Sequence, residues 1–293
     1  NMPIFSSKNL TWDFTTNYGT QVSMIDKITG GATIPLTSAA GSTNVVLVAG
    51  KPIGQIYAYP VVRSLDQKRT DGTAYFTDAM KASGRYVVVK DPIYGGNVVV
   101  DTLTKGAMIG SEQLPLGDPS PKFNMSFINN ITYKDFINLN FQFDWINGSH
   151  LYNQTKEWMY RDGISNDFDK VVNIPGFTPA AWTAYHASFY YALWGSTRGV
   201  GNNVTKDYFL EDASFVRLRN ISLSIDLAKT NTFKKFRKLQ LVFTGRNIMT
   251  WTKYTGMDPE ISSGSVNSSF DRGIDHSTIP NTKSYQIGLN IGF

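Results

Sequence analysis

The chain has 293 residues, a net charge of +5, no cysteine and 13% aromatic side chains, while only 17% of its residues are charged. The absence of cysteine excludes a disulfide scaffold and thiol chemistry. No run of Lys and Arg indicates a nucleic-acid surface, and no apolar stretch approaches the roughly 18 residues of a transmembrane helix. Asn, Thr and Ser stand where charged residues are usual, which favours strands and turns over helices.

Apolar and polar residues alternate with period two in six stretches, the pattern of a strand with one apolar and one polar face. The expected strands lie near residues 10–25, 122–133, 136–150, 214–228, 238–252 and 283–293. Several of these stretches exceed ten residues, whereas strands of soluble proteins usually have about five or six. The alternation therefore predicts long, two-faced strands.

Short turns alternate with long connections between these strands. Tyr133–Asp135 is a tight turn, and the long connections are 26–121, 151–213 and 253–282. An outer-membrane barrel has short periplasmic turns and long extracellular loops, and aromatic girdles near its strand ends. Aromatic residues do lie near the strand ends, among them Trp12, Tyr133, Trp145, Trp251 and Phe293. A soluble β-sandwich shows the same alternation, but the spacing favours a transmembrane barrel.

Five stretches carry more specific motifs. In chain order they read GKPIGQIYAY (Gly50–Tyr59), LGDPSPKFNMSFINNITYKDFINLNFQF (Leu116–Phe143), SFVRLRNISLSIDL (Ser214–Leu227), FTGRNIMTWTKYTGMDPEI (Phe243–Ile261) and IPNTKSYQIGLNIGF (279–293). Together they resemble the C-terminal part of the SusC-like TonB-dependent transporters of Bacteroidetes outer membranes. The acidic, Gly-containing stretch that this family often has before its G-D-P-x-P-K motif is missing here, so we expect no calcium-like site.

The resemblance implies an all-β fold, the C-terminal strands of an antiparallel barrel of about 22 strands whose plug domain is absent from this chain. Six strands cannot close in a bilayer, because both sheet edges would expose unpaired backbone groups to lipid. We therefore expect completion by an N-terminal plug and further strands, from the same protein or a separate chain.

The resemblance also implies a function. The whole protein would import oligosaccharides, or alternatively peptides, across the outer membrane of a Gram-negative bacterium. A SusD-like surface lipoprotein would cover the long loops, and the TonB complex would act through the plug. Two other functions stay open, a passive porin-like barrel and a secreted carbohydrate-binding β-sandwich. No nucleophile turn, metal-ligand spacing or cofactor loop is present, so we expect no enzyme, no cofactor and no metal site.

The connection 151–213 is crowded with aromatic residues. Flat rings there could stack on sugars or contact peptide side chains, and the candidates are Trp158, Tyr160, Trp182, Tyr185 and Trp194. Residue by residue, packing of the loop against itself or a partner is the favoured interpretation. The segment TPAAWTAYHASFYYALW is also compatible with a helix.

Three arginines mark further positions in the expected barrel strands. Arg217 and Arg219 share a parity with the lipid-facing Ile221, so a bulge or twist is needed to turn them into the lumen, and Arg246 has lumenal parity. They could steer anionic substrates, although pairing with plug carboxylates is favoured. The terminal Phe293 resembles the C-terminal assembly signature of outer-membrane barrels.

The densest basic cluster lies largely outside the expected strands. Lys234, Lys235 and Arg237 occupy a short polar connection between two expected strands, and Lys238 begins the second of these strands. A solvated turn explains such a cluster without any partner. We therefore assign it no function from the sequence.

Overall fold

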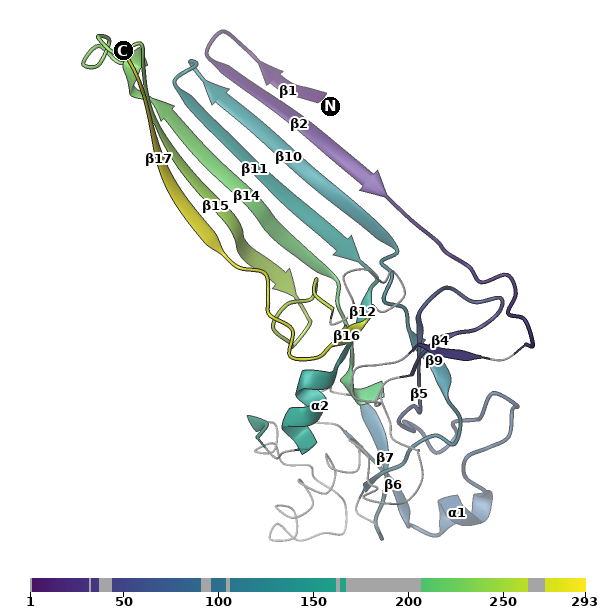
Figure 1. Ribbon diagram of the computed structural model, residues 1–293. Coiled ribbons are helices and arrows are strands. Elements are labelled where there is room, and N and C mark those ends of the chain that lie inside the picture. The colour runs from purple at the N-terminus through teal and green to yellow at the C-terminus, as the bar shows by residue number, and fades with distance from the viewer. Residues whose placement is uncertain are drawn as a thin grey trace.

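A computed structural model describes residues 2–31, 33–36, 44–90, 96–103, 106–161, 164–166, 207–262 and 272–293 (Figure 1). Its largest element is a seven-stranded antiparallel sheet with the strand order β1-β2-β10-β11-β14-β15-β17. These strands are β1 (Met2–Ser6), β2 (Leu10–Gly19), β10 (Phe123–Tyr133), β11 (Ile137–Asn147), β14 (Phe215–Asp226), β15 (Lys238–Thr252) and β17 (Ser284–Gly292). Below, this sheet is called the wall.

The two faces of the wall differ in chemistry, and the strand register shows why. Ile131, Leu139, Leu223, Phe243 and Ile287 stand opposite one another across five strands and form an apolar row. The neighbouring row, on the other face, is polar throughout and consists of Asn130, Asn140, Ser222, Thr244 and Gln286. The alternation predicted from the sequence is therefore matched in these two rows across five strands of the wall.

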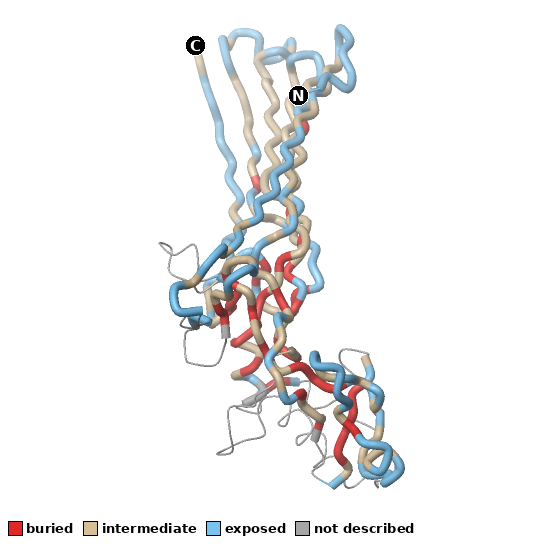
Figure 2. The backbone as a smooth tube through the Cα atoms, turned by 90° about the vertical axis from the view of Figure 1, so that its right-hand side faces the viewer, coloured by how far each residue is buried: buried red, intermediate tan, exposed pale blue. Residues whose placement is uncertain are grey.

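The apolar face is exposed. Ile287 is 77% exposed and Phe243 41%. A β-sandwich would cover such a face with a second sheet, and Figure 2 shows instead that the buried residues gather outside the wall. The wall is a portion of an antiparallel β-barrel, which confirms the predicted fold class.

The strand expected over 10–25 is shorter than its pattern, and a seventh strand was not expected. β2 ends at Gly19, which pairs with Asn124 near the start of its neighbour β10. β10 itself begins at Phe123, so the ladder offers no partner to residues beyond Gly19. Residues 20–25 therefore have alternation but no ladder partner in the wall, and Met24 makes only an isolated bridge to Pro52. β1 has five residues including Pro3, too few for a period-two pattern to be recognised.

The long connections expected as loops contain folded structure, which is a difference from the prediction. They hold three further sheets, with the orders β3-β4-β5-β9, β6-β7-β8 and β13-β12-β16. These strands are β3 (Ile34–Leu36), β4 (Asn44–Leu47), β5 (Gln55–Ala58), β6 (Tyr86–Lys90), β7 (Asn97–Asp101), β8 (Gly106–Ala107), β9 (Leu114–Gly117), β12 (His150–Asn153), β13 (Leu210–Asp212) and β16 (Ile274–Asp275). Apolar runs such as YVVVK and NVVVD supply a core that loops alone would lack.

The helices of the described residues lie outside the wall strands. They are α1 (Asp78–Ala82), α2 (Gln154–Arg161) and the 3-10 turns Asp207–Phe209 and Leu227–Lys229. Within the described ranges, no helix is long and apolar enough to cross a membrane. We call the small sheets, α1, α2 and their connections at one end of the wall the loop layer; the short turns lie at the opposite end (Figure 1).

The loop layer has a real hydrophobic core. Its buried residues come from segments far apart in the sequence, among them Ile56, Val98, Phe209 and Ile274, all at most 2% exposed. The wall, in contrast, contributes few fully buried side chains, because it is one layer thick (Figure 2). The loop layer is therefore positioned by its own packing and joined to the wall at the ends of β11, β14 and β15.

Candidate functional site

A bulge in β14 lies where the wall meets the loop layer. The register on β11 passes from Arg217 opposite Asp144 to Asn220 opposite Gln142, which leaves Arg219 as the extra residue. The ladder to β15 shifts between Leu218 and Asn220 as well. An extra residue reverses the parity of the strand. The expected bulge is therefore present, and it puts Arg217 on the polar face.

Arg217 is buried in an ion cluster at this junction. Its guanidinium is 2.5 Å from Asp258 and 2.5 Å from Glu260, and it also donates to the Thr250 hydroxyl at 2.9 Å. The residue is only 2% exposed. A buried guanidinium needs such paired and hydrogen-bonded partners to offset its desolvation.

Arg219 extends the cluster across three strands. It donates to Asp144 of β11 at 2.7 Å and to both oxygens of Glu260, at 2.9 and 2.7 Å. A longer contact, 3.3 Å, reaches the side chain of Asn247 on β15. The carboxylates that pair with both arginines thus belong to this chain, whereas the sequence analysis favoured carboxylates of a plug.

Asp258 closes the cluster from the loop side. Besides Arg217, it accepts hydrogen bonds from the backbone N–H groups of Glu260 and Asn281, both at 3.0 Å. Burial works to raise the pKa of this carboxyl, but the hydrogen bonds from Arg217 and the two N–H groups outweigh it and lower the pKa. The D-P-E segment therefore shapes the loop through its backbone hydrogen bonds and also supplies the carboxylates that pair with Arg217.

A hollow of about 340 Å³ lies beside the ion cluster. It is lined by Arg217, Asp258, Lys283 and the hydroxyl and amide side chains of Thr250 and Asn281, among others. The polar character of these groups suits a hydrated space. Arg246 lies on β15, as Thr250 does, but it is exposed. It stands opposite Asn220 and Ser284 on the polar face.

A second polar network fixes the loop layer above the wall. Buried Glu211 accepts from the backbone and the hydroxyl of Thr255, both at 2.7 Å, and from Lys156 at 3.3 Å. Tyr254 donates to Asp275 at 2.6 Å, and burial, together with this carboxylate, raises the pKa of the phenol. The connection after β15 is thus tied to α2, β13 and β16.

The aromatic candidates fall largely outside the described residues. Trp158 of α2 is described, and its ring meets the ring of His276 edge-on, with centroids 4.4 Å apart. This contact shows packing inside the loop layer, the favoured interpretation. The side chain of Tyr160 and the residues Trp182, Tyr185 and Trp194 lie outside the described residues, as does the segment that allowed a helix.

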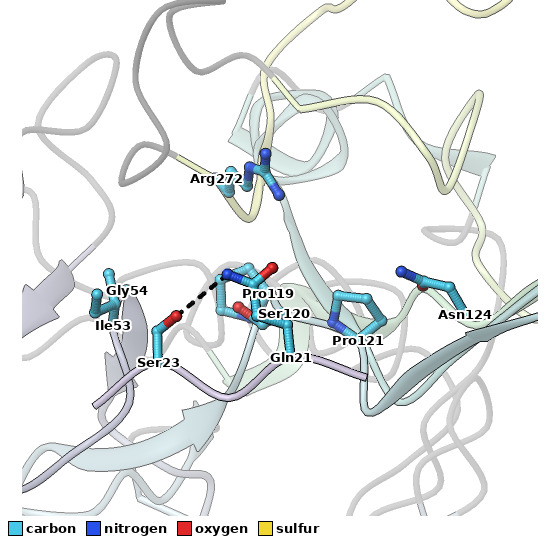
Figure 3. A pocket seen from close by; sticks show the side chains of 9 residues that line it. All are labelled: Gln21, Ser23, Ile53, Gly54, Pro119, Ser120, Pro121, Asn124 and Arg272. Carbon is cyan, nitrogen blue, oxygen red and sulfur yellow. Dashed lines mark hydrogen bonds between the residues drawn. The ribbon is translucent and has the colours of Figure 1, made fainter. Parts of the chain in front are cut away.

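A second hollow, of about 290 Å³, joins two of the sequence motifs. Figure 3 shows its lining, which comes from the segment after β2, from Ile53 and Gly54, from the Pro119–Pro121 stretch, from Asn124 and from Arg272. Gly273, with φ +96°, lets its backbone approach Pro119, since a Cβ there would lie 2.8 Å from the proline. The G-x-P-x-G and G-D-P-x-P motifs thus meet at one place in the fold.

Several participants were not singled out from the sequence. Asp144 and Glu211 contribute to the two networks, but each looks like an ordinary polar residue of a strand in the sequence. The only sequence signal was indirect: two arginines at apolar parity require a bulge, and two cations buried by a bulge require carboxylates nearby.

Comparisons with known proteins agree with this geometry. No family model matches the chain. It is 24% identical over 98% of its length to TonB-dependent receptor P3 of Formosa agariphila, and 27% identical over 67% of its length to TonB-dependent receptor SusC of Bacteroides thetaiotaomicron. It spans 27% and 18% of those two proteins.

The fold comparison points the same way. Structures of the RagAB peptide importer superpose on 99% of the chain with TM-scores of 0.56 and 0.53 for the 'closed-closed' and 'open-open' states, at 16% identity. The chain covers 28% and 27% of those chains. Sequence and fold together show that this chain resembles TonB-dependent receptors over nearly its whole length and has the fold of a part of an antiparallel β-barrel.

Proposed function

We propose that the chain is part of the wall and mouth of a TonB-dependent importer in the outer membrane of a Gram-negative bacterium. The importer takes up oligosaccharides or peptides together with a SusD-like surface lipoprotein. The role of this part is to form the wall, to hold the loop layer and to contact substrate, without bond-making chemistry. The observation that carries the proposal is the two-faced wall, with an apolar row on one side and a polar row on the other, each matched across five strands.

The height of the apolar face supports a bilayer as its surroundings. On β11 the apolar positions run from Ile137 to Trp145. At about 3.4 Å per residue and a tilt of about 40°, this stretch rises about 21 Å along a barrel axis, close to the roughly 25 Å apolar band of outer-membrane barrels. Aromatic rings of Phe123 and Trp145, 4.9 Å apart, mark the loop-side limit of the band.

The edges of the wall support completion by further strands. β1 and β17 are the outermost strands and each pairs on one side within the described residues. Unpaired backbone groups in lipid are unfavourable by several kcal/mol each. Barrel strands and a plug from the rest of the protein, or from a separate chain, would pair with these edges and fill the lumen.

The substrate class is proposed from the polar face. Its amide and hydroxyl side chains, such as Asn130, Asn140, Ser222 and Thr244, can hydrogen-bond the hydroxyl groups of sugars and the amides of peptides. The RagAB structures are described as those of a peptide importer. We therefore propose peptides as well as oligosaccharides as the substrate class. A SusD-like lipoprotein would cover the loop layer, and TonB would act through the plug.

Uptake by cells with and without the full-length gene tests the proposal. We expect accumulation of labelled oligosaccharides or peptides to require the gene, the neighbouring lipoprotein and TonB. Uptake that persists without TonB would instead indicate a passive porin, which planar-bilayer conductance of the purified protein would reveal. A full-length protein that stays soluble without detergent would contradict the membrane assignment altogether.

A further inference from the structure

The turn between β14 and β15, together with the first residue of β15, is strongly basic. Residues 227–238 read LAKTNTFKKFRK and contain five basic residues and no acidic one. We call this segment the basic loop. Lys229, Lys234, Lys235, Arg237 and Lys238 are all exposed. No ion pair between described residues involves any of these five side chains.

The basic loop is held in a defined place. At its start, the Asp226 carboxylate accepts from the N–H of Ala228 at 3.1 Å and ends β14. At its finish, the N–H of Arg237 donates to the carbonyl of Gly292 at 2.9 Å, which ties the loop to β17. The loop thus sits at the turn end of the wall, beside the C-terminus (Figure 1).

Aromatic contacts show which side of the wall the loop faces. The ring of Phe236 lies 5.8 Å from that of Phe293, and Phe293 has the parity of the apolar residues Leu289 and Ile291. Phe233, in the same loop, is 38% exposed. The loop therefore adjoins the lipid-facing side, not the polar side that would line a lumen.

The surrounding charges do not neutralise the loop. The two other turns at this end are Ser7–Asn9, with Lys8, and the hairpin turn with Lys134 and Asp135. Lys134 lies over the ring of Tyr133, 5.2 Å from its centre. The turn end of the wall thus combines a basic excess with exposed aromatic rings at the rim of an apolar face.

We propose that the basic loop binds the headgroups of anionic phospholipids at the turn-side surface of the bilayer, with Phe233 and Phe236 at the level of the interface. The inference rests on the proposed membrane location. Basic residues next to a membrane are attracted to anionic lipid, and aromatic rings favour the interface between headgroups and chains. An acidic protein would match the charge, but it would not explain the contact of the Phe236 ring with Phe293 on the lipid side.

The test uses the full-length protein in detergent, titrated with phosphatidylglycerol and, as the neutral reference, phosphatidylcholine, with native mass spectrometry to count bound lipids. The variant is K234Q/K235Q/R237Q. Since each basic residue near an anionic surface contributes about a fivefold gain in binding, we expect at least a tenfold loss of phosphatidylglycerol affinity and no change for phosphatidylcholine. Lys238 is left intact because it pairs with Gly292 on the polar face.

A matched control removes the same charge elsewhere. Lys51, Lys68 and Lys90 are exposed residues of the loop layer, and K51Q/K68Q/K90Q should change lipid affinity less than twofold. Equal affinity of the unaltered protein for both lipids, or an equal loss in the control, would overturn the inference. A protein that needs detergent and imports substrate but shows no lipid preference refutes this inference alone, whereas one that is soluble without detergent refutes the proposed function.

Discussion

The indole Nε1 of Trp12 donates a hydrogen bond to the side-chain oxygen of Asn129, 3.0 Å away on the neighbouring strand. Asn129 stands between apolar residues on the apolar face of the wall, yet it is only 6% exposed. An amide facing lipid without a partner would be unfavourable. The Trp12 indole supplies the hydrogen bond that this buried amide oxygen needs.

This pair predicts an asymmetric response to mutation. Trp12→Phe should destabilise the full-length protein by about 1–3 kcal/mol, because it leaves the Asn129 oxygen buried without its donor. Adding Asn129→Leu to that variant should restore most of the loss, because no polar group is then left without a partner. Thermal unfolding of the detergent-solubilised protein measures both. Equal stability of the single and double variants would contradict the coupling.

The ion cluster predicts a larger effect at Arg217. Arg217→Met should destabilise the protein by about 3–5 kcal/mol, because Asp258 would remain buried without its cation. The double variant Arg217→Met/Asp258→Asn should lose less than the single one. Arg246→Met is the matched control, since that residue is exposed, and it should stay within about 0.5 kcal/mol. Protease cleavage in 253–262 reports loosening of the loop.

The same cluster predicts a loss of stability in acid. The pKa of Asp258 is lowered in the folded protein, so the carboxylate stabilises the fold above its ordinary pKa of 3.8 and this contribution disappears as pH falls through the folded value. We expect the unfolding temperature to hold from pH 7 to about pH 5 and to fall below about pH 4. Asp258→Asn should start lower and show a shallower acid slope. An unchanged slope would show that other carboxyls dominate.

The hairpin turn between β10 and β11 predicts a stabilising change. Lys134 and Asp135 have φ of +49° and +50°, and the N–H of Phe136 donates to the carbonyl of Tyr133 at 2.9 Å. Two central residues with positive φ are typical of a type I′ turn, which favours Asn-Gly. Lys134→Asn/Asp135→Gly should therefore stabilise the protein by about 0.5–1 kcal/mol. Asn9→Gly, at a turn residue without positive φ, is the control and should give no gain.

The wall could be predicted from sequence because its physics is local. A period-two pattern specifies which face of each strand is apolar, and tight turns such as Lys134–Asp135 set the register of neighbours. β2 shows the limit of that logic, because its end is decided by where β10 begins and not by its own residues. The bulge at Arg219 was predictable for the same local reason, since its parity conflicted with Ile221.

The loop layer could not be predicted in the same way. Its core joins Ile56, Val98, Phe209 and Ile274 across more than 200 residues of sequence, and pairing over such separations leaves no short-range pattern. Its polar network is equally non-local: Glu211 meets Lys156 and Thr255 only after the fold has formed. The sequence therefore shows that the long connections contain charged and aromatic residues, but not which residues these side chains contact.

A change at Phe293 should affect assembly of the barrel more than its stability. The Phe293 side chain is 91% exposed and, among the described residues, its ring contacts that of Phe236, so its loss removes little packing within the wall. The sequence predicts that Phe293 is part of an assembly signature, and its deletion should therefore lower the amount of full-length protein in the outer membrane severalfold. The protein that does insert should unfold within a few degrees of the unaltered one. Phe293→Tyr keeps the aromatic ring and should insert normally, while normal membrane levels of the deletion variant would refute the assembly role.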